Sequence, residues 1–135
     1  MVSSVEISVF AWLVLCLFAM MDQLSTYHAV KFTTAALGKK LSESREANPF
    51  QKFLWKHFSY EASALLGLLI QWVFYTIAVI ILSLINNDFA TLGLLAFFSA
   101  FESSIMTSNF LYYRRCRNLK RRYPKDYKRL MKDLT

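Results

Sequence analysis

Glycine is scarce in this chain, with only three among 135 residues. Phosphate-binding loops and dinucleotide fingerprints need several glycines at fixed spacing, because the backbone must approach the phosphates closely. Neither motif is present, and there is no Gly-x-Ser-x-Gly elbow or other ordered catalytic set. The sequence therefore predicts a protein that is not itself an enzyme, with no catalytic residue and no cofactor.

Cysteine and histidine are also rare, with two residues of each. Cys16 lies within a long apolar segment and Cys116 follows the last one, so neither suits a disulfide in an oxidising compartment. His28 and His57 do not belong to a His-x-x-x-His or Glu-x-x-His motif, and no cysteine pair has metal-ligand spacing. We expect neither a disulfide nor a metal ion bound by this chain alone.

Hydrophobic residues make up 56% of the chain and gather in three long blocks. A helix needs roughly 20 mostly apolar residues to cross a hydrocarbon core about 30 Å thick. We predict spanning helices at about 7–30, 61–85 and 89–113, joined by a loop at 31–60 and by the turn Asn86-Asn87-Asp88. The rest of the chain is too short for a separate soluble domain. The sequence predicts one all-α integral membrane domain, 1–135.

The sixteen basic residues are absent from the N-terminus and from the second turn. Six lie in the loop 31–60 and ten in the tail 114–135. Three spans place the loop and the tail on the same side, and cytoplasmic segments of membrane proteins carry an excess of Lys and Arg. We predict an outside N-terminus and a cytoplasmic C-terminus. The net charge of +7 then reflects topology, so nucleic acid is not expected as a partner.

The basic tail is predicted to contact anionic lipids of the cytoplasmic leaflet. Its first part holds six candidate lipid-surface residues: Arg114, Arg115, Arg117, Lys120, Arg121 and Arg122. After Pro124, one helix face carries Tyr127, Leu130, Met131 and Leu134. This spacing predicts a short helix lying against the leaflet or against a partner.

The loop before the second span contains a helix start. Asn48 is a preferred N-cap residue, and Pro49 suits the first helical position, where the N–H has no helical partner. Apolar side chains then recur at helical spacing between lysines, at Phe50, Phe53, Leu54 and Phe58. They predict an amphipathic helix in the membrane interface, with Trp55 and Tyr60 in the aromatic belt.

Polar residues inside the predicted spans are the candidate interaction sites, since charged groups are costly in hydrocarbon. They are Asp22, Ser25, Thr26, Glu61, Gln71, Glu102, Ser103 and Asn109. Asp22 lies nine residues before Lys31, roughly 13 Å along a helix. Ser25 and Thr26 share its helix face, so their hydroxyls can donate toward its carboxylate.

Two interpretations of these polar residues remain. They form either a proton or cation site, or hydrogen bonds that hold neighbouring helices or subunits together. The second is favoured, because the acids do not form a periodic relay. The position of Glu46 bears on this choice. If Glu46 folds back beside Asp22, two acids share a site, which implies a cation or a basic partner. If it points into water, the loop is only a hinge.

The pattern Asp22-x-x-Ser25-Thr26 followed by Glu46-x-Asn48-Pro49 resembles a group of small prokaryotic membrane proteins of unknown function with three or four spans. The match covers about 30 residues. The resemblance implies that Asp22, Thr26, Glu46 and Asn48 meet at the cytoplasmic end of the bundle, in a prokaryotic cell membrane. It implies no activity.

Three helices, each with one polar stripe and broad apolar faces, bury little among themselves, which favours a protein that interacts with other membrane subunits. We expect a small non-catalytic subunit of a larger membrane complex; respiratory and ammonia- or methane-monooxygenase-type complexes are hosts by analogy alone. The alternative is a small homo-oligomeric transporter or channel for ions or protons, with Asp22 and Glu102 lining the route.

Overall fold

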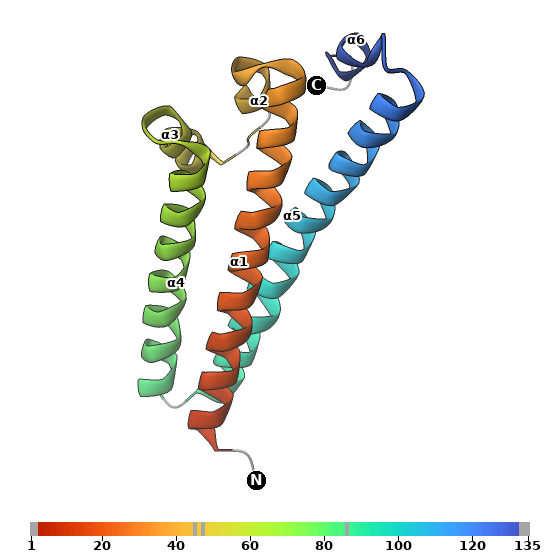
Figure 1. Ribbon diagram of the computed structural model, residues 1–135. Helices are drawn as coiled ribbons and strands as arrows, with labels where there is room; N and C mark the ends of the chain where they lie inside the picture. Colours follow the sequence, from red (N-terminus) through yellow and green to blue (C-terminus); the bar gives the residue numbers. More distant parts are fainter. Residues whose placement is uncertain (1–2, 45, 47, 86, 133–135) are drawn as a thin grey trace.

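The computed structural model describes residues 3–44, 46, 48–85 and 87–132. These residues form six helices and no strand (Figure 1). Three are long: α1 (Ser4–Leu37), α4 (Tyr60–Leu84) and α5 (Asp88–Arg122). Three are short: α2 (Lys39–Ser44), α3 (Pro49–His57) and α6 (Tyr127–Lys132). The all-α prediction is confirmed for the part of the chain that is described.

The three long helices are each long and apolar enough to cross a membrane. α4 agrees with the predicted span 61–85 to within one residue at each end. α1 and α5 extend several residues beyond the predicted spans 7–30 and 89–113, into threonine-rich and basic sequence. The extension of α5 has a physical reason, because Leu, Lys and Arg are good helix formers and cations near a helix C-terminus favour its dipole.

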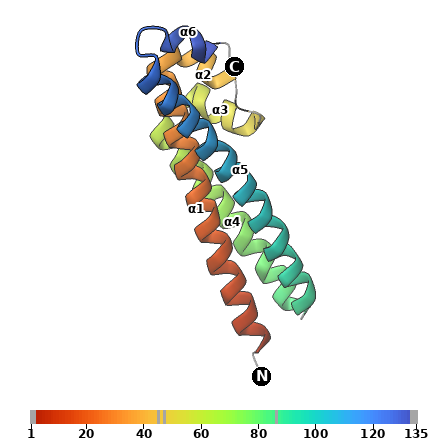
Figure 2. The same cartoon turned by 90° about the vertical axis from the view of Figure 1, so that its right-hand side faces the viewer.

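α1 packs along both α4 and α5, which contact each other much less. Figure 1 shows α4 and α5 close together near the turn that joins them and diverging toward the opposite end, and Figure 2 shows α2, α3 and α6 gathered at that opposite end. We call it the basic end. Toward the basic end, α1 therefore lies between α4 and α5 (Figure 1).

The half of the bundle near the α4–α5 turn has an apolar core. Leu15 and Ala19 of α1 are buried with Tyr75 and Val79 of α4, and Phe98 of α5 packs against them. Two indole N–H groups tie α1 to α4: Trp12 donates to Thr76 at 2.8 Å, and Trp72 to the carbonyl oxygen of Cys16 at 3.1 Å. This half of the bundle is therefore closed by side-chain packing.

The connection between α1 and α4 folds onto the bundle. Gly38 ends α1 with a φ of 88°, as its position before two lysines predicts. The following helix α2 was not predicted, and Ser42 within it donates a buried hydrogen bond of 3.1 Å to the carbonyl oxygen of Val30. The loop at 31–60 is thus largely helical and packed.

Asn48 and Pro49 start α3 as predicted, with the Asn48 side chain accepting from the backbone N–H of Phe50 at 3.0 Å. The aromatic side chains Phe50, Phe53 and Phe58 are exposed, in keeping with an amphipathic helix. Trp55 differs from the prediction of a lipid-facing belt. It is 3% exposed and packs edge-on against Tyr60, because α3 turns this side toward the protein.

The short helix α6 contacts α5 and α1. Tyr127 is buried against Cys116, with Phe32 and Ala36 of α1 beside them. Burial raises the pKa of the Tyr127 hydroxyl above its ordinary value. We predicted that the Tyr127 face of this helix lies against the leaflet or a partner, but Tyr127 packs on the chain itself. Leu134 and Asn86, which were also part of the predictions, lie outside the described residues.

Candidate functional site

A polar pocket of about 700 Å³ lies between the diverging helices, on the side of the basic end. We call it the Asp22 pocket. α1 contributes Asp22, Gln23 and Thr26; the connection contributes Glu46, Asn48, Pro49 and Gln51; α4 contributes Gln71; and α5 contributes Glu102 and Asn109 among its lining residues. Polar residues of all three long helices therefore meet within one chain.

A series of hydrogen bonds crosses the pocket wall from α1 through α4 to α5. Gln23 Nε2 donates to Gln71 Oε1 at 3.1 Å, and Gln71 Nε2 donates to Glu102 Oε1 at 3.3 Å. The Tyr75 hydroxyl donates to the same Glu102 oxygen at 2.6 Å. Glu102 is thus held by two donors on α4, and only one of its two oxygens is used.

Asp22 and Glu102 are a pair of buried carboxylates. Their exposed fractions are 6% and 2%, and the two side chains interact directly, with Gln71 next to them. Asp22 Oδ1, Glu102 Oε2 and Gln23 Oε1 accept no hydrogen bond from any described residue. Two like charges this close in a medium of low dielectric repel strongly, so the pair favours a proton or a cation between its members.

Glu46 folds back toward the bundle. Its side chain is half-buried, lines the Asp22 pocket and accepts from the backbone N–H of Asn48 at 2.8 Å. Its charge also acts on Asp22. The sequence left open whether Glu46 points to Asp22 or to water, and the structure places it on the side of Asp22.

Asn109, two helical turns beyond Glu102 on α5, connects α5 to α1. Its Nδ2 donates to Ser25 Oγ at 3.0 Å and to Thr26 Oγ1 at 3.1 Å. The prediction that Ser25 donates to the Asp22 carboxylate differs from the structure. Ser25 Oγ instead donates to the backbone carbonyl oxygen of Asp22 at 2.9 Å, the local bond that a serine within a helix readily forms.

A smaller pocket of about 160 Å³ lies further toward the basic end. It shares Thr26, Glu46, Ser108 and Asn109 with the Asp22 pocket, and continues to Ser42 and other residues near the ends of α1 and α5. The polar lining therefore extends from the buried carboxylates toward the basic end of the bundle.

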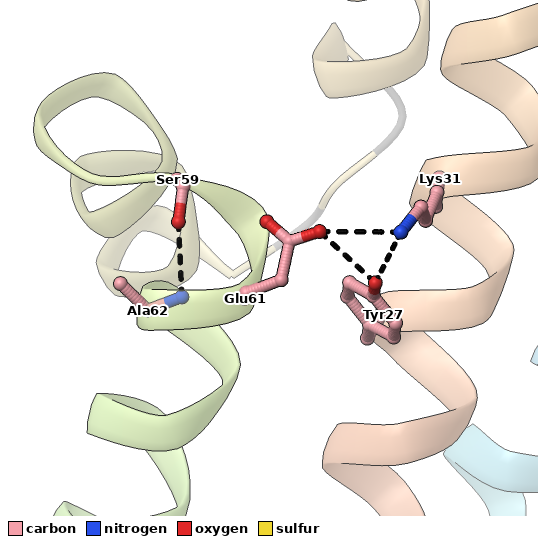
Figure 3. Close-up of polar contacts among 5 residues, drawn as sticks. All are labelled: Tyr27, Lys31, Ser59, Glu61 and Ala62. Carbon is pink, nitrogen blue, oxygen red and sulfur yellow. Dashed lines mark hydrogen bonds and ion pairs between the residues drawn. The ribbon is translucent and has the colours of Figure 1, made fainter.

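Glu61 lies apart from this site. Its carboxylate accepts from Lys31 Nζ at 3.2 Å and from the Tyr27 hydroxyl at 3.0 Å, as Figure 3 shows. The side chains of Lys31 and Glu61 are 60% and 61% exposed. Water screens an exposed ion pair of this kind, so it contributes little to stability and Glu61 has a surface role.

The other predicted residues are spread over two regions. Ser103 is half-buried but does not line the Asp22 pocket. The predicted lipid-surface residues all lie in the last turns of α5 and are exposed: Arg114, Arg115, Arg117, Lys120, Arg121 and Arg122.

Gln23 was missed by the sequence analysis. It is 8% exposed and belongs to the hydrogen-bond series described above. Gly67 of α4 makes room for it, because a Cβ at that position would lie 2.9 Å from Gln23 Oε1. The signal was present in the sequence, since an amide in mid-span needs a partner just as an acid does.

Among the described residues, no group of three or more His, Cys, Asp or Glu side chains is placed to hold a metal ion. Both cysteine side chains are buried, Cys16 in α1 and Cys116 in α5. What the site offers is a pair of carboxylates, several amides and hydroxyls, and open volume.

Comparison of the chain with protein-family models, with curated proteins and with solved structures found no match in any of the three. The resemblance to small prokaryotic membrane proteins therefore stays a prediction that rests on the short motif.

Proposed function

We propose that the protein binds a proton or a small cation in the Asp22 pocket and carries it across a prokaryotic cell membrane, as a small transporter or channel. The observation that supports this proposal is the buried pair Asp22 and Glu102, whose unpaired oxygens lie at an open pocket. Intramembrane acids are costly, and their usual role is in ion or proton pathways.

The charge of the pocket favours a cation over an anion. Three acids line it, Asp22, Glu46 and Glu102, and its lining contains no Lys, Arg or His among the described residues. The amide oxygen of Gln23 adds a further unpaired acceptor. In the predicted orientation, the pocket lies in the cytoplasmic half of the membrane and the smaller pocket leads toward the cytoplasm.

The test is ion flux in proteoliposomes loaded with a pH-sensitive dye, with proton, Na⁺ and K⁺ gradients applied in turn. Asp22→Asn and Glu102→Gln should abolish the flux, because each removes one charge of the pair while keeping the size of the side chain. Glu61→Gln is the matched control, an acid-to-amide change at the surface ion pair, and should leave the flux unchanged.

Gel filtration and circular dichroism should show that all three variants stay folded. Flux at the wild-type rate in both Asp22→Asn and Glu102→Gln, in folded protein, would exclude these residues from the route and with them this proposal. Equal loss in Glu61→Gln would also argue against it, since any lost charge would then have the same effect.

A second candidate function, an accessory subunit of a membrane complex, is favoured by a different observation. α5 carries a line of small, exposed residues four apart, Ala96, Ala100, Ser104 and Ser108, the last two of which also border the Asp22 pocket. Membrane helices pack closely through such residues. Purification from native membranes in mild detergent distinguishes the two: a fixed set of foreign subunits supports the accessory role, and the chain alone or with its own copies supports the first proposal.

A further inference from the structure

A third pocket, of about 650 Å³, lies where α5 leaves its apolar section. Three arginines, one lysine and one asparagine line it together with two aromatic residues. All of these come from α5, and no acid is among them. The pocket is therefore a concentration of positive charge and hydrogen-bond donors that lies apart from the Asp22 pocket.

The spacing of the donors places them on one side of the helix. Arg114, Arg117, Asn118 and Arg121 stand at i, i+3, i+4 and i+7, which brings them above one another over two turns. Phe110 lies one turn before Arg114 on the same line and is 61% exposed. This face of α5 thus changes from apolar to cationic between Phe110 and Arg114. Such a change suits the boundary between the acyl chains and the headgroups of a lipid leaflet.

Part of the pocket wall is fixed to α1. The ring of Tyr113 packs edge-on against Phe32, with centroids 5.1 Å apart, and Lys120 Nζ lies 6.0 Å from the centroid of the same Phe32 ring. The ion pairs formed between described residues involve Lys31 with Glu61 and Lys39 with Glu43, so neither neutralises the pocket. Its charge is available to a ligand.

We propose that this pocket binds the phosphate group of an anionic phospholipid. The planar guanidinium groups of Arg114 and Arg117 donate to the phosphate oxygens, Asn118 and Arg121 add donors further from the membrane, and Phe110 contacts the upper part of an acyl chain. Arg115 and Arg122 belong to the same helical turns but do not line the pocket. A discrete site therefore depends on Arg114 and Arg117 and not on Arg115 and Arg122.

The experiment compares two variants that each lose two positive charges, Arg114→Gln/Arg117→Gln and Arg115→Gln/Arg122→Gln. The full chain is purified in neutral detergent, and native mass spectrometry measures binding of added phosphatidylglycerol, with zwitterionic phosphatidylcholine as the reference lipid of zero net charge. We expect phosphatidylglycerol to bind the first variant roughly tenfold more weakly than the second, because charge-assisted hydrogen bonds are lost in addition to net charge. Gel filtration checks that both variants are folded.

Three results would overturn the proposal. Equal weakening in the two variants would mean diffuse attraction to net charge, and binding of phosphatidylcholine as tightly as phosphatidylglycerol would mean that the anion is not recognised. The third arm adds inorganic phosphate at the lipid concentration: displacement of the lipid would make free phosphate the ligand, whereas unchanged lipid binding supports the headgroup. None of these outcomes depends on ion transport through the Asp22 pocket.

Discussion

The Tyr75 hydroxyl donates a hydrogen bond of 2.6 Å to Glu102, joining α4 to α5 at the point where the apolar core meets the Asp22 pocket. Tyr75 is 2% exposed, so its ring belongs to the core and its hydroxyl to the polar site. This one residue therefore couples the closed half of the bundle to the half that is open. Few other contacts join α4 and α5 directly, which makes the bond important for their spacing.

Replacing Tyr75 by Phe should lower the free energy of unfolding by about 1 kcal/mol, the usual scale for a hydrogen bond between membrane helices. Glu102→Ala alone, which removes the acceptor, should also lower the free energy of unfolding, and the double variant should cost less than the sum, because both changes remove the same bond. The measurement is a double-mutant cycle in mixed micelles titrated with a denaturing detergent. Additive costs would show that Tyr75 and Glu102 are not coupled.

Replacing Asn109 by Ala removes both hydrogen bonds to Ser25 and Thr26, the polar connection between α5 and α1. We expect a loss of about 1 kcal/mol in the free energy of unfolding, since the two hydroxyls also lose their donor. Ser103→Ala is the control, a half-buried polar residue on the same helix outside the pocket, and should change the value by less than about 0.5 kcal/mol. A loss of equal size in both variants would contradict the role given to Asn109.

Much of the fold follows from local sequence signals. The length of the apolar runs located α4, while Asn48, Pro49 and Gly38 marked helix ends through capping rules that need no knowledge of the rest of the chain. Likewise, the inward face of α5 was readable from the spacing of its polar residues, Glu102 and Asn109 among them. Such features depend on neighbours within one or two helical turns.

The rest of the site depends on contacts between distant segments. The sequence around Glu46 does not show that this side chain turns toward Asp22. Its position depends on how α2 packs on α1, which the hydrogen bond from Ser42 to the Val30 carbonyl oxygen helps to fix. Gln23 meets Gln71 only because Gly67 leaves space between the helices. A sequence pattern gives the face on which a residue lies, but not the partner that it meets.

The predicted orientation is open to a labelling test. Asn87→Cys, at the start of α5, should react in intact cells with a maleimide that does not cross membranes, while Lys40→Cys, in the exposed part of α2, should react only after the cells are opened. Cys16 and Cys116 are replaced by Ala first, although both are buried. The reverse pattern of labelling would place the basic end outside and contradict the charge argument.

The folded-back position of Glu46 determines whether two or three acids share the Asp22 pocket, and it can be measured by cross-linking. Glu46 and Ser108 line the same two pockets, so the pair Glu46→Cys/Ser108→Cys should be joined by a short bis-maleimide in a chain free of other cysteines. Thr107 precedes Ser108, is exposed and lines neither pocket, which makes Glu46→Cys/Thr107→Cys the matched control.

Cross-linking should be much faster in the first pair than in the control, because the helix turns neighbouring side chains about 100° apart. Equal rates would mean that the connection moves freely over α5, and the negative charge of Glu46 would then not be held beside Asp22. A clear difference would fix a third acid at the pocket. In that case Glu46→Gln should weaken cation binding, since the site would lose one of its three negative charges while the buried pair stays intact.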